Sequence, residues 1–239
     1  MAQVKSGIAK KPAGEGAERD QNYTVSDGCY AREDGSNAKR DDNQSDKPAE
    51  SKIQSRYNSY NEIKDKSIVE TTPQDFHVAL SEAKESVRTE DRWRVDVHGA
   101  EDYEGDKLFA TPKGSCVAVE PDGNIISLCK NNADKDIHGA DLLKHAVENG
   151  GDRLDAFSKL YPFYAGKGFE PVSWVPFDEQ YAPEGWLPEY EKEPIIFWKY
   201  TGKKTKFSKD EFLKEIPASK SYDEAKEIRD RSIKSKDEK

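Results

Sequence analysis

Cys116-Val-Ala-Val-Glu-Pro-Asp-Gly-Asn-Ile-Ile-Ser-Leu128 carries the clearest structural signal in this chain. Two short apolar runs, 116–119 and 125–128, flank a segment that contains Pro-Asp-Gly-Asn. Proline fixes the backbone for the start of a turn, and glycine and asparagine tolerate the conformations needed at its end. The stretch therefore predicts a β-hairpin.

Helical and strand patterns follow the hairpin. Leu142, Leu143, Ala146 and Val147 form one helical stripe, and Asn149-Gly-Gly151 supplies a stop signal. Further downstream, the sequence predicts a strand, a short helix and two last strands, over residues 153–157, 159–165, 172–177 and 194–200.

The segment before the hairpin predicts a helix between two strands. A short strand is expected at 67–70, and Thr72-Pro73 has the capping oxygen and the proline that begin many helices. One helical face then carries Phe76, Ala79, Leu80, Ala83 and Val87. Apolar and polar residues alternate from Trp93 to His98, which predicts a half-buried strand.

This order of elements mixes hairpins with helical crossovers. We therefore expect an α/β (α+β) fold with a mixed sheet and with helices on its faces. About 135 residues, roughly 66–202, are enough to build one such core.

The two ends of the chain differ from this middle part. Of 239 residues, 34% are hydrophobic and 36% are charged, yet the first phenylalanine is Phe76 and the first leucine is Leu80. Residues 1–65 are expected to be a disordered leader, because they have too little apolar surface to offset the entropy of ordering. The leader is either a solubilising tail or a docking segment for a partner through its tyrosines.

Residues 203–239 predict a helical C-terminal appendage. Ser208-Lys-Asp-Glu211 and Ser221-Tyr-Asp-Glu224 both have the spacing of a capping box, in which the first and fourth residues satisfy each other's backbone groups. The two helices are expected either to pack on the core or to reach a protein partner.

Composition excludes several classes of protein. No apolar run approaches the roughly 20 residues of a membrane span, and three cysteines cannot all pair in a disulfide scaffold. A net charge of -9 gives little support to nucleic-acid binding. No secretory signal is evident at the start, so a cytoplasmic location is expected. The four histidines and three cysteines show no metal-binding spacing, and we expect no metal.

The run Tyr164-Ala-Gly-Lys-Gly-Phe169 matches the Tyr-x-x-x-Gly-Phe signature that GNAT-family N-acetyltransferases carry after their fifth strand. With the order of elements derived above, residues 66–202 resemble the GNAT superfamily, and also the GNAT-like domains of phage and mobile-element proteins. The resemblance implies a GNAT-like acyl-CoA N-acyltransferase fold and acetyl-CoA as the cofactor.

A second family signature, Arg/Gln-x-x-Gly-x-Gly/Ala, aligns with Lys135-Asp-Ile-His-Gly-Ala140. Lys135 replaces Arg or Gln, and His138 replaces the first glycine. A helix begins here, and free N–H groups at a helix start suit a diphosphate. The alternative is an ordinary capped helix, to which Asp141 contributes an acid in the first turn. The resemblance implies cofactor contacts at Leu128, Cys129, Lys130, Lys135, His138, Gly139, Ala140, Asp141 and Leu142.

Acetyl transfer needs a proton donor for the leaving thiolate and a base for the amine. The resemblance implies Tyr164 as the donor, whereas the residues alone favour its packing against Phe169. Glu120 or Asp155 is the candidate base, although each is also explained as a solvated carboxylate at a strand. Cys129 is either a small buried hydrophobe or a nucleophilic thiol.

The loop 178–193 mixes six acids with Tyr181, Trp186 and Tyr190, opposed only by Lys192. Carboxylates beside aromatic faces suit a cationic amine, such as a polyamine, an aminoglycoside-like amine or a lysine side chain. A solvated loop that covers a sheet edge is the alternative. For the whole protein, the leading hypothesis is an acetyl-CoA-dependent N-acetyltransferase. The alternative is a catalytically inactive GNAT-like module of a phage or mobile-element complex.

Overall fold

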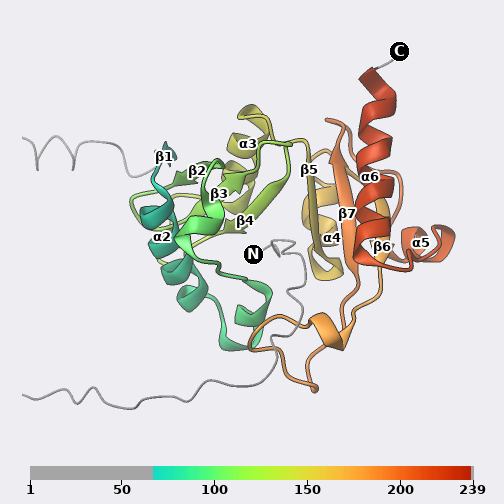
Figure 1. Cartoon of the computed structure of the whole chain (residues 1–239), viewed down its shortest axis with the longest axis horizontal. Coiled ribbons are helices and arrows are strands. Elements are labelled where there is room, and N and C mark those ends of the chain that lie inside the picture. The colour runs from blue at the N-terminus through green and yellow to red at the C-terminus, as the bar shows by residue number, and fades with distance from the viewer. Residues whose placement is uncertain (1–66, 238–239) are drawn as a thin grey trace, which may run out of the picture. The chain divides into compact units, whose positions relative to one another are not determined.

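Two antiparallel sheets form the framework of the computed structural model, which describes residues 67–237 (Figure 1). The described residues all belong to one compact unit, and the expected leader 1–65 lies outside them. The first sheet has the order β1-β2-β3-β4 and contains Val69–Glu70, Lys107–Ala110, Cys116–Val119 and Ile125–Cys129. The second has the order β5-β7-β6 and contains Arg153–Phe157, Ile195–Tyr200 and Phe169–Val175.

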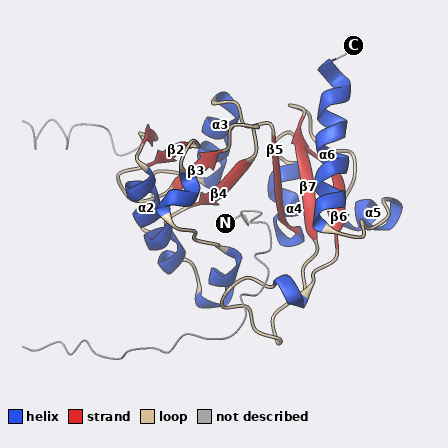
Figure 2. Cartoon of the chain, viewed as in Figure 1, coloured by secondary structure: helices blue, strands red, loops and turns tan. Residues whose placement is uncertain are grey.

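Helices accompany both sheets, as Figure 2 shows, and the mixed α/β class is confirmed. The parallel component of the sheets is a single bridge between Asn124 and Arg153. The α-helices are α2 (Pro73–Ser86), α3 (Gly139–Glu148), α4 (Tyr161–Ala165), α5 (Lys209–Glu215) and α6 (Tyr222–Asp237). Short 3-10 helices are η1 (Thr89–Arg94), η2 (Ala100–Tyr103), η3 (Ser158–Leu160) and η4 (Glu179–Tyr181).

The predicted hairpin is β3 and β4. Glu120 donates its N–H to the Asn124 carbonyl at 2.8 Å, which closes the turn. Gly123 adopts a φ of +89°, and a side chain there would also collide with the Asp152 carboxylate. Only glycine fits both requirements at this position.

Helix α2 starts as its sequence predicts, because the Thr72 side chain accepts the N–H of Asp75 and Pro73 occupies the first turn. Its apolar face, Phe76, Ala79, Leu80 and Ala83, is buried against one face of the first sheet. On the opposite side, α3 and α4 cover a larger core that runs across both sheets.

The prediction of a strand over 93–98 is wrong. Residues 89–94 form η1, and 95–99 continue without regular structure. Trp93 and Val95 are buried as the alternation suggested, but Arg94 is buried too, because it pairs with a carboxylate 99 residues away. The strand after α2 is instead β2, built around the Leu108-Phe109 pair.

The C-terminal helices pack on the second sheet. Phe212 of α5 joins the larger core, and Ala225 of α6 is fully buried. Ser173 on β6 donates its hydroxyl to the Ala225 carbonyl at 2.6 Å, and the Trp174 indole donates to the Ile216 carbonyl at 2.7 Å. Both capping-box serines accept the backbone N–H three residues later, as predicted.

Within the described part of the chain, no helix has the length and apolar character that a membrane crossing requires.

Candidate active site

Strands β4 and β5 are edge strands of different sheets and meet at one point. β4 pairs only with β3, and β5 pairs only with β7. Between them lies the parallel bridge of Asn124 and Arg153, at the start of both strands. Beyond it the strands run apart (Figure 1). The outer edge of β4 therefore has backbone groups with no strand partner among residues 67–237.

A bulge bends β4 shortly after this bridge. The β3–β4 register advances by two residues on β3, from Cys116 to Ala118, but by three on β4, from Ile126 to Cys129. Ser127 adopts a φ of +51°, which is uncommon for a residue other than glycine. Bulges increase local twist and are frequent beside active sites, where they redirect backbone groups.

The bulge precedes the predicted contacts Leu128, Cys129 and Lys130. Leu128 and Cys129 are buried, and the Lys130 ammonium donates to the Asn131 carbonyl at 3.3 Å. Burial raises the pKa of Cys129, so its thiolate is disfavoured at neutral pH. These features favour the small-hydrophobe interpretation of Cys129 over the nucleophile.

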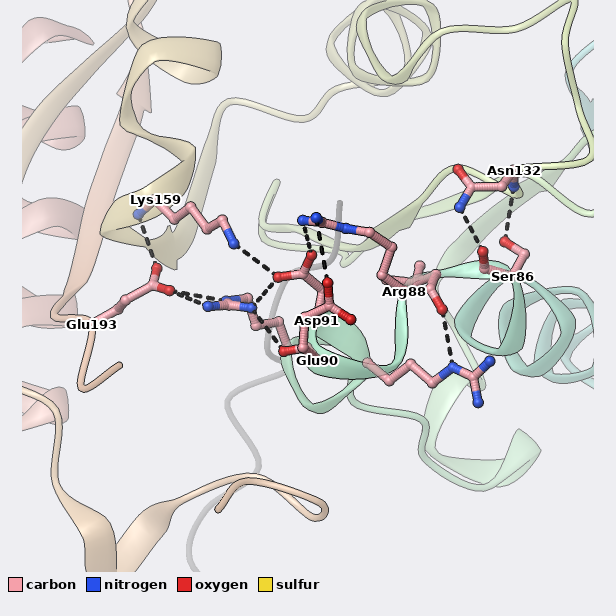
Figure 3. Close-up of polar contacts among 10 residues, drawn as sticks. Ser86, Arg88, Glu90, Asp91, Asn132, Lys159 and Glu193 are labelled. Carbon is pink, nitrogen blue, oxygen red and sulfur yellow. Dashed lines mark hydrogen bonds and ion pairs between the residues drawn. The ribbon is translucent and has the colours of Figure 1, made fainter. Parts of the chain in front are cut away.

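A buried carboxylate holds the loop that leads into α3. Asp134 is fully buried and accepts the hydroxyls of Thr111 at 2.7 Å and Ser115 at 2.9 Å. The same loop is fixed to the end of α2, because Asn132 donates its backbone N–H to the Ser86 hydroxyl at 2.8 Å (Figure 3). The start of α3 is thus placed by the buried hydrogen bonds of Asp134 and by an exposed contact with the end of α2.

The start of α3 presents two free backbone donors. The N–H groups of Gly139 and Ala140 make no hydrogen bond with any described residue. The Asp141 carboxylate accepts the His138 N–H at 2.8 Å. Asp141 therefore caps the helix, as expected for the alternative of an ordinary capped helix. Lys135 is exposed and donates to the Asn132 carbonyl, and Leu142 is buried in the core.

Tyr164 is fully buried in an aromatic cluster. Its ring centroid lies 5.0 Å from that of Phe163, 5.9 Å from Trp198 and 6.0 Å from Phe169. The contact with Phe169 matches the packing interpretation of the Tyr-x-x-x-Gly-Phe run. Phe163 also approaches Gly139, where a Cβ would lie 3.6 Å from its ring. The aromatic cluster therefore borders the start of α3.

The two candidate bases, Glu120 and Asp155, are linked through Asn124 and Arg229. Arg229 of α6 donates from Nη1 to Asn124 Oδ1 at 3.2 Å, and Asn124 donates from Nδ2 to Glu120 Oε2 at 2.7 Å. The same Nη1 lies 3.9 Å from Asp155 Oδ1. Arg229 is 0% exposed and Asp155 is 2% exposed, so this is a buried polar cluster at the junction of the two sheets.

Burial raises the pKa of Asp155 to about 6. Removal from water disfavours the charged form of a carboxyl group. The positive charge of Arg229 and the nearby Tyr222 hydroxyl oppose this shift without cancelling it, while Glu120 adds to it. A carboxyl group that titrates near neutrality suits proton exchange with an amine.

The loop 178–193 is anchored at its end by a second buried cluster. Glu193 pairs with Arg94 of η1 and accepts the Lys159 N–H at 3.0 Å (Figure 3). Asp91 in turn accepts the Lys159 ammonium at 2.8 Å. Of the three aromatic residues in this loop, Tyr190 stacks on Trp93. Trp186 packs at a tilt against Phe177, and Tyr181 is exposed.

Asn124 and Arg229 are site residues that the sequence analysis missed. A signal existed for Arg229, because it follows the buried Ala225 by four residues and so lies on the same helical face. A charged residue at such a position is either solvated or paired inside the fold. Nothing in the turn sequence marks Asn124 as more than a turn residue.

Among residues 67–237, no group of three or more His, Cys, Asp or Glu side chains is placed to hold a metal ion.

No protein-family model matches the chain, and no curated protein matches it. Solved structures to which it is similar include the solution structure of apo-form YjaB from Escherichia coli, at 14% identity and a TM-score of 0.40, covering 57% of this chain and 98% of that one. A GNAT-family acetyltransferase from Staphylococcus aureus Mu50 is 12% identical with a TM-score of 0.36, over 56% of this chain and 98% of that one. We therefore base the proposed function on the contacts within this chain.

Proposed function

We propose that residues 66–202 form a GNAT-like domain that transfers an acetyl group from acetyl-CoA to an amine. The observation that carries this proposal is the junction of β4 and β5, two edge strands that share one bridge and then run apart beside a bulge. An unpaired strand edge offers the alternating donors and acceptors that an extended amide-containing ligand needs. The pantetheine arm of coenzyme A is such a ligand.

The start of α3 fits the diphosphate of the same cofactor. Gly139 and Ala140 have free N–H groups at the positive end of a helix dipole. Lys135 and His138 are exposed beside them and add donors or positive charge. Leu128, Cys129 and Lys130 would offer backbone groups to the arm. Bound acetyl-CoA would supply the activated acetyl thioester.

The chain's own side chains would handle the protons. Asp155 or Glu120 takes a proton from the ammonium form of the acceptor. Tyr164 donates to the leaving thiolate, since a phenol with pKa near 10 is protonated at neutral pH. The acidic aromatic loop 178–193 would attract a cationic acceptor, for which a polyamine or a lysine side chain is suitable.

Calorimetric titration of the full chain with acetyl-CoA tests this proposal. We expect micromolar binding, and we expect Ala140→Glu to weaken it at least tenfold, because the added carboxylate repels the diphosphate. A helix start tolerates an acid, so the fold should survive. The control is Gln74→Glu, which makes the same charge change at the second residue of α2. Absence of binding up to millimolar acetyl-CoA would contradict the proposal.

The proton donor has a separate test. Tyr164→Phe keeps the aromatic contacts and removes only the hydroxyl. We expect acetyl-CoA binding to be retained and kcat to fall about 10²-fold, within the range for general acid catalysis. An unchanged kcat would remove Tyr164 from the mechanism.

A second candidate function is a GNAT-like binding module without catalysis, for instance in a phage or mobile-element complex. Two observations favour it: the full burial of Tyr164 and the Asp141 carboxylate at the start of α3. Such a module gives no thiol release with any amine acceptor.

A further inference from the structure

We propose that α6 is part of the catalytic site, with Asp155 as the proton acceptor and Arg229 as the residue that positions it. This inference rests on the proposed acetyl transfer and deepens it, because it chooses between the two candidate bases and assigns a role to a helix outside the GNAT-like region.

The cluster of Asn124, Asp155 and Arg229 lies at the junction of the two sheets. Asn124 and Arg153 make the one bridge between the two sheets among residues 67–237, and Arg229 donates to the side chain of Asn124. Asp155 lies two residues along β5 from Arg153. Arg229 therefore reaches the point from which β4 and β5 diverge, where the proposed acyl group would lie.

The ion pair between Arg229 and Asp155 is long and incompletely hydrogen-bonded. Arg229 and Asp155 approach only to 3.9 Å, and Arg229 Nη2 makes no hydrogen bond with any described residue. A buried charge pair that leaves a donor unsatisfied is costly, and well-packed apolar residues often replace such pairs without loss of stability. Stability alone is therefore a weak explanation for charges at these positions.

Asp155 and Glu120 have different surroundings. Glu120 is half-buried and accepts a hydrogen bond from Asn124. Asp155 faces Arg229, Tyr222 and Lys226 of α6, with Glu120 as the neighbouring acid. Asp230 accepts the Arg229 Nε–H at 2.9 Å and fixes the guanidinium from its other side. Arg229 is thus the strongest influence that favours the ionised form of Asp155, against the effect of burial.

The proton transfer is balanced within this cluster. An N–H bond of the substrate ammonium breaks, its electron pair stays on nitrogen, and the proton goes to a carboxylate oxygen of Asp155. A carboxylate has about four acceptor sites, so the contacts with Arg229 and Tyr222 leave room for this proton. The neutral amine is then the nucleophile, and Arg229 keeps Asp155 ionised beforehand.

The test uses the full chain with ¹³C-labelled aspartate, so that the Asp155 carboxyl is titrated directly by NMR. Arg229→Met should raise its pKa by about one unit, because an opposite charge at this distance lowers a carboxyl pKa by roughly 1–3 units. Thiol release from acetyl-CoA with spermidine or a lysine-containing peptide should show an acid limb of kcat/KM that moves by the same amount. A purely structural role of Arg229 would not move that limb.

The matched control is Arg231→Met on the same helix. Arg231 is exposed and pairs with Glu227, so its loss should leave both the titration and the rate unchanged. If Arg229→Met does not fold, Arg229→Lys serves instead, because it keeps the charge but loses the guanidinium fork. For Arg229→Lys we expect a smaller rise in the Asp155 pKa than for Arg229→Met. The acid limb of kcat/KM should move by the same amount as the Asp155 pKa does in that variant.

The outcomes separate this inference from the proposed function. If the carboxyl titration moves while the acid limb stays, or if the titration itself does not respond, the assignment of Asp155 and Arg229 is wrong and the transferase proposal stands. If acetyl-CoA neither binds nor releases thiol with any acceptor, both fall together.

Discussion

Arg94 and Arg229 are both buried arginines that pair with a buried carboxylate, yet their surroundings differ. Arg94 donates to Glu193 from Nε and Nη2 and to Asp91 from Nη1, and its guanidinium lies 4.3 Å from the Trp93 ring centroid. Arg229 reaches Asp155 only at 3.9 Å and leaves Nη2 without a hydrogen bond among the described residues. The Arg94 cluster ties segments that are distant in sequence, whereas the Arg229 cluster leaves a buried guanidinium donor without an acceptor among the described residues.

The largest effect on stability should follow from breaking the cluster of Arg94, Asp91 and Glu193. Glu193→Ala leaves Arg94 buried without its main partner and removes the acceptor of the Lys159 N–H. Breaking a buried pair in this way costs about 3–5 kcal/mol, measured as the free energy of unfolding in urea. Glu189→Ala, an exposed acid in the same loop, should cost under about 0.5 kcal/mol. Equal losses in the two variants would show that the Arg94 cluster is not a structural anchor.

The pH dependence of stability should have opposite signs in the two clusters. The Asp155 pKa rises from 3.8 to about 6 on folding, so between these values the folded chain holds a proton that the unfolded chain has lost. Stability therefore falls as pH rises through this window, by about 3 kcal/mol at 1.36 kcal/mol per unit. The difference between unfolding free energies of the wild type and Asp155→Asn from pH 4 to 7 measures it.

Asp91 provides the contrasting case. Burial opposes its ionisation, but hydrogen bonds from Lys159 and Arg88 and the nearby positive charges lower its pKa on balance. Its contribution is present above the ordinary aspartate value and is lost as pH falls through the lowered one. The wild type minus Asp91→Asn difference should thus rise with pH. A slope of the same sign for Asp91 and Asp155 would remove the distinction between the clusters.

Double-mutant cycles should give coupling energies that differ between the pairs. We expect about 2–3 kcal/mol for Arg94 with Glu193 and about 1 kcal/mol for Arg229 with Asp155 at pH 7. At pH 5 most Asp155 carboxyls are protonated, so the second coupling should approach zero while the first persists. A second coupling that is unchanged at pH 5 would contradict the raised pKa.

The smallest effect is expected at Lys159. Its ammonium pairs with Asp91, but the side chain is 46% exposed, and exposed pairs contribute about 0.2–1 kcal/mol. Lys159→Gln should therefore lower the unfolding free energy by less than about 1 kcal/mol, and added salt should reduce the difference further. A loss comparable to that of Glu193→Ala would mean that Lys159, rather than Arg94, holds the cluster together.

The sequence predicted local structure well where local signals suffice. The turn 120–124, the Thr72 cap and the Ser208 capping box all depend on residues within four positions of each other. The prediction of a strand over 93–98 failed because the decisive contact of this segment, Arg94 with Glu193, spans 99 residues. Alternation of apolar and polar residues cannot show that a polar residue such as Arg94 is itself buried by a distant ion pair.

The candidate site also contains residues that the sequence identified and contacts that it could not predict. Glu120, Asp155 and the start of α3 were identified from the sequence and a family resemblance, and their roles remain predictions. Their connection through Asn124 and Arg229 was not predictable, because it depends on α6 packing back against the second sheet. Ile228 of α6 is exposed whereas Arg229 beside it is fully buried, so apolar character alone does not identify the inward face of this helix.

The bond between Arg229 and Asn124 also has a consequence for synthesis. The two residues are 105 positions apart, and a ribosome makes the chain from its N-terminus at about 5–20 residues per second. For several seconds, the residues of β3, β4 and β5 have been synthesised but Arg229 has not. A nascent chain therefore buries Asp155 without a counter-charge or keeps it hydrated, and the junction of the two sheets is completed last.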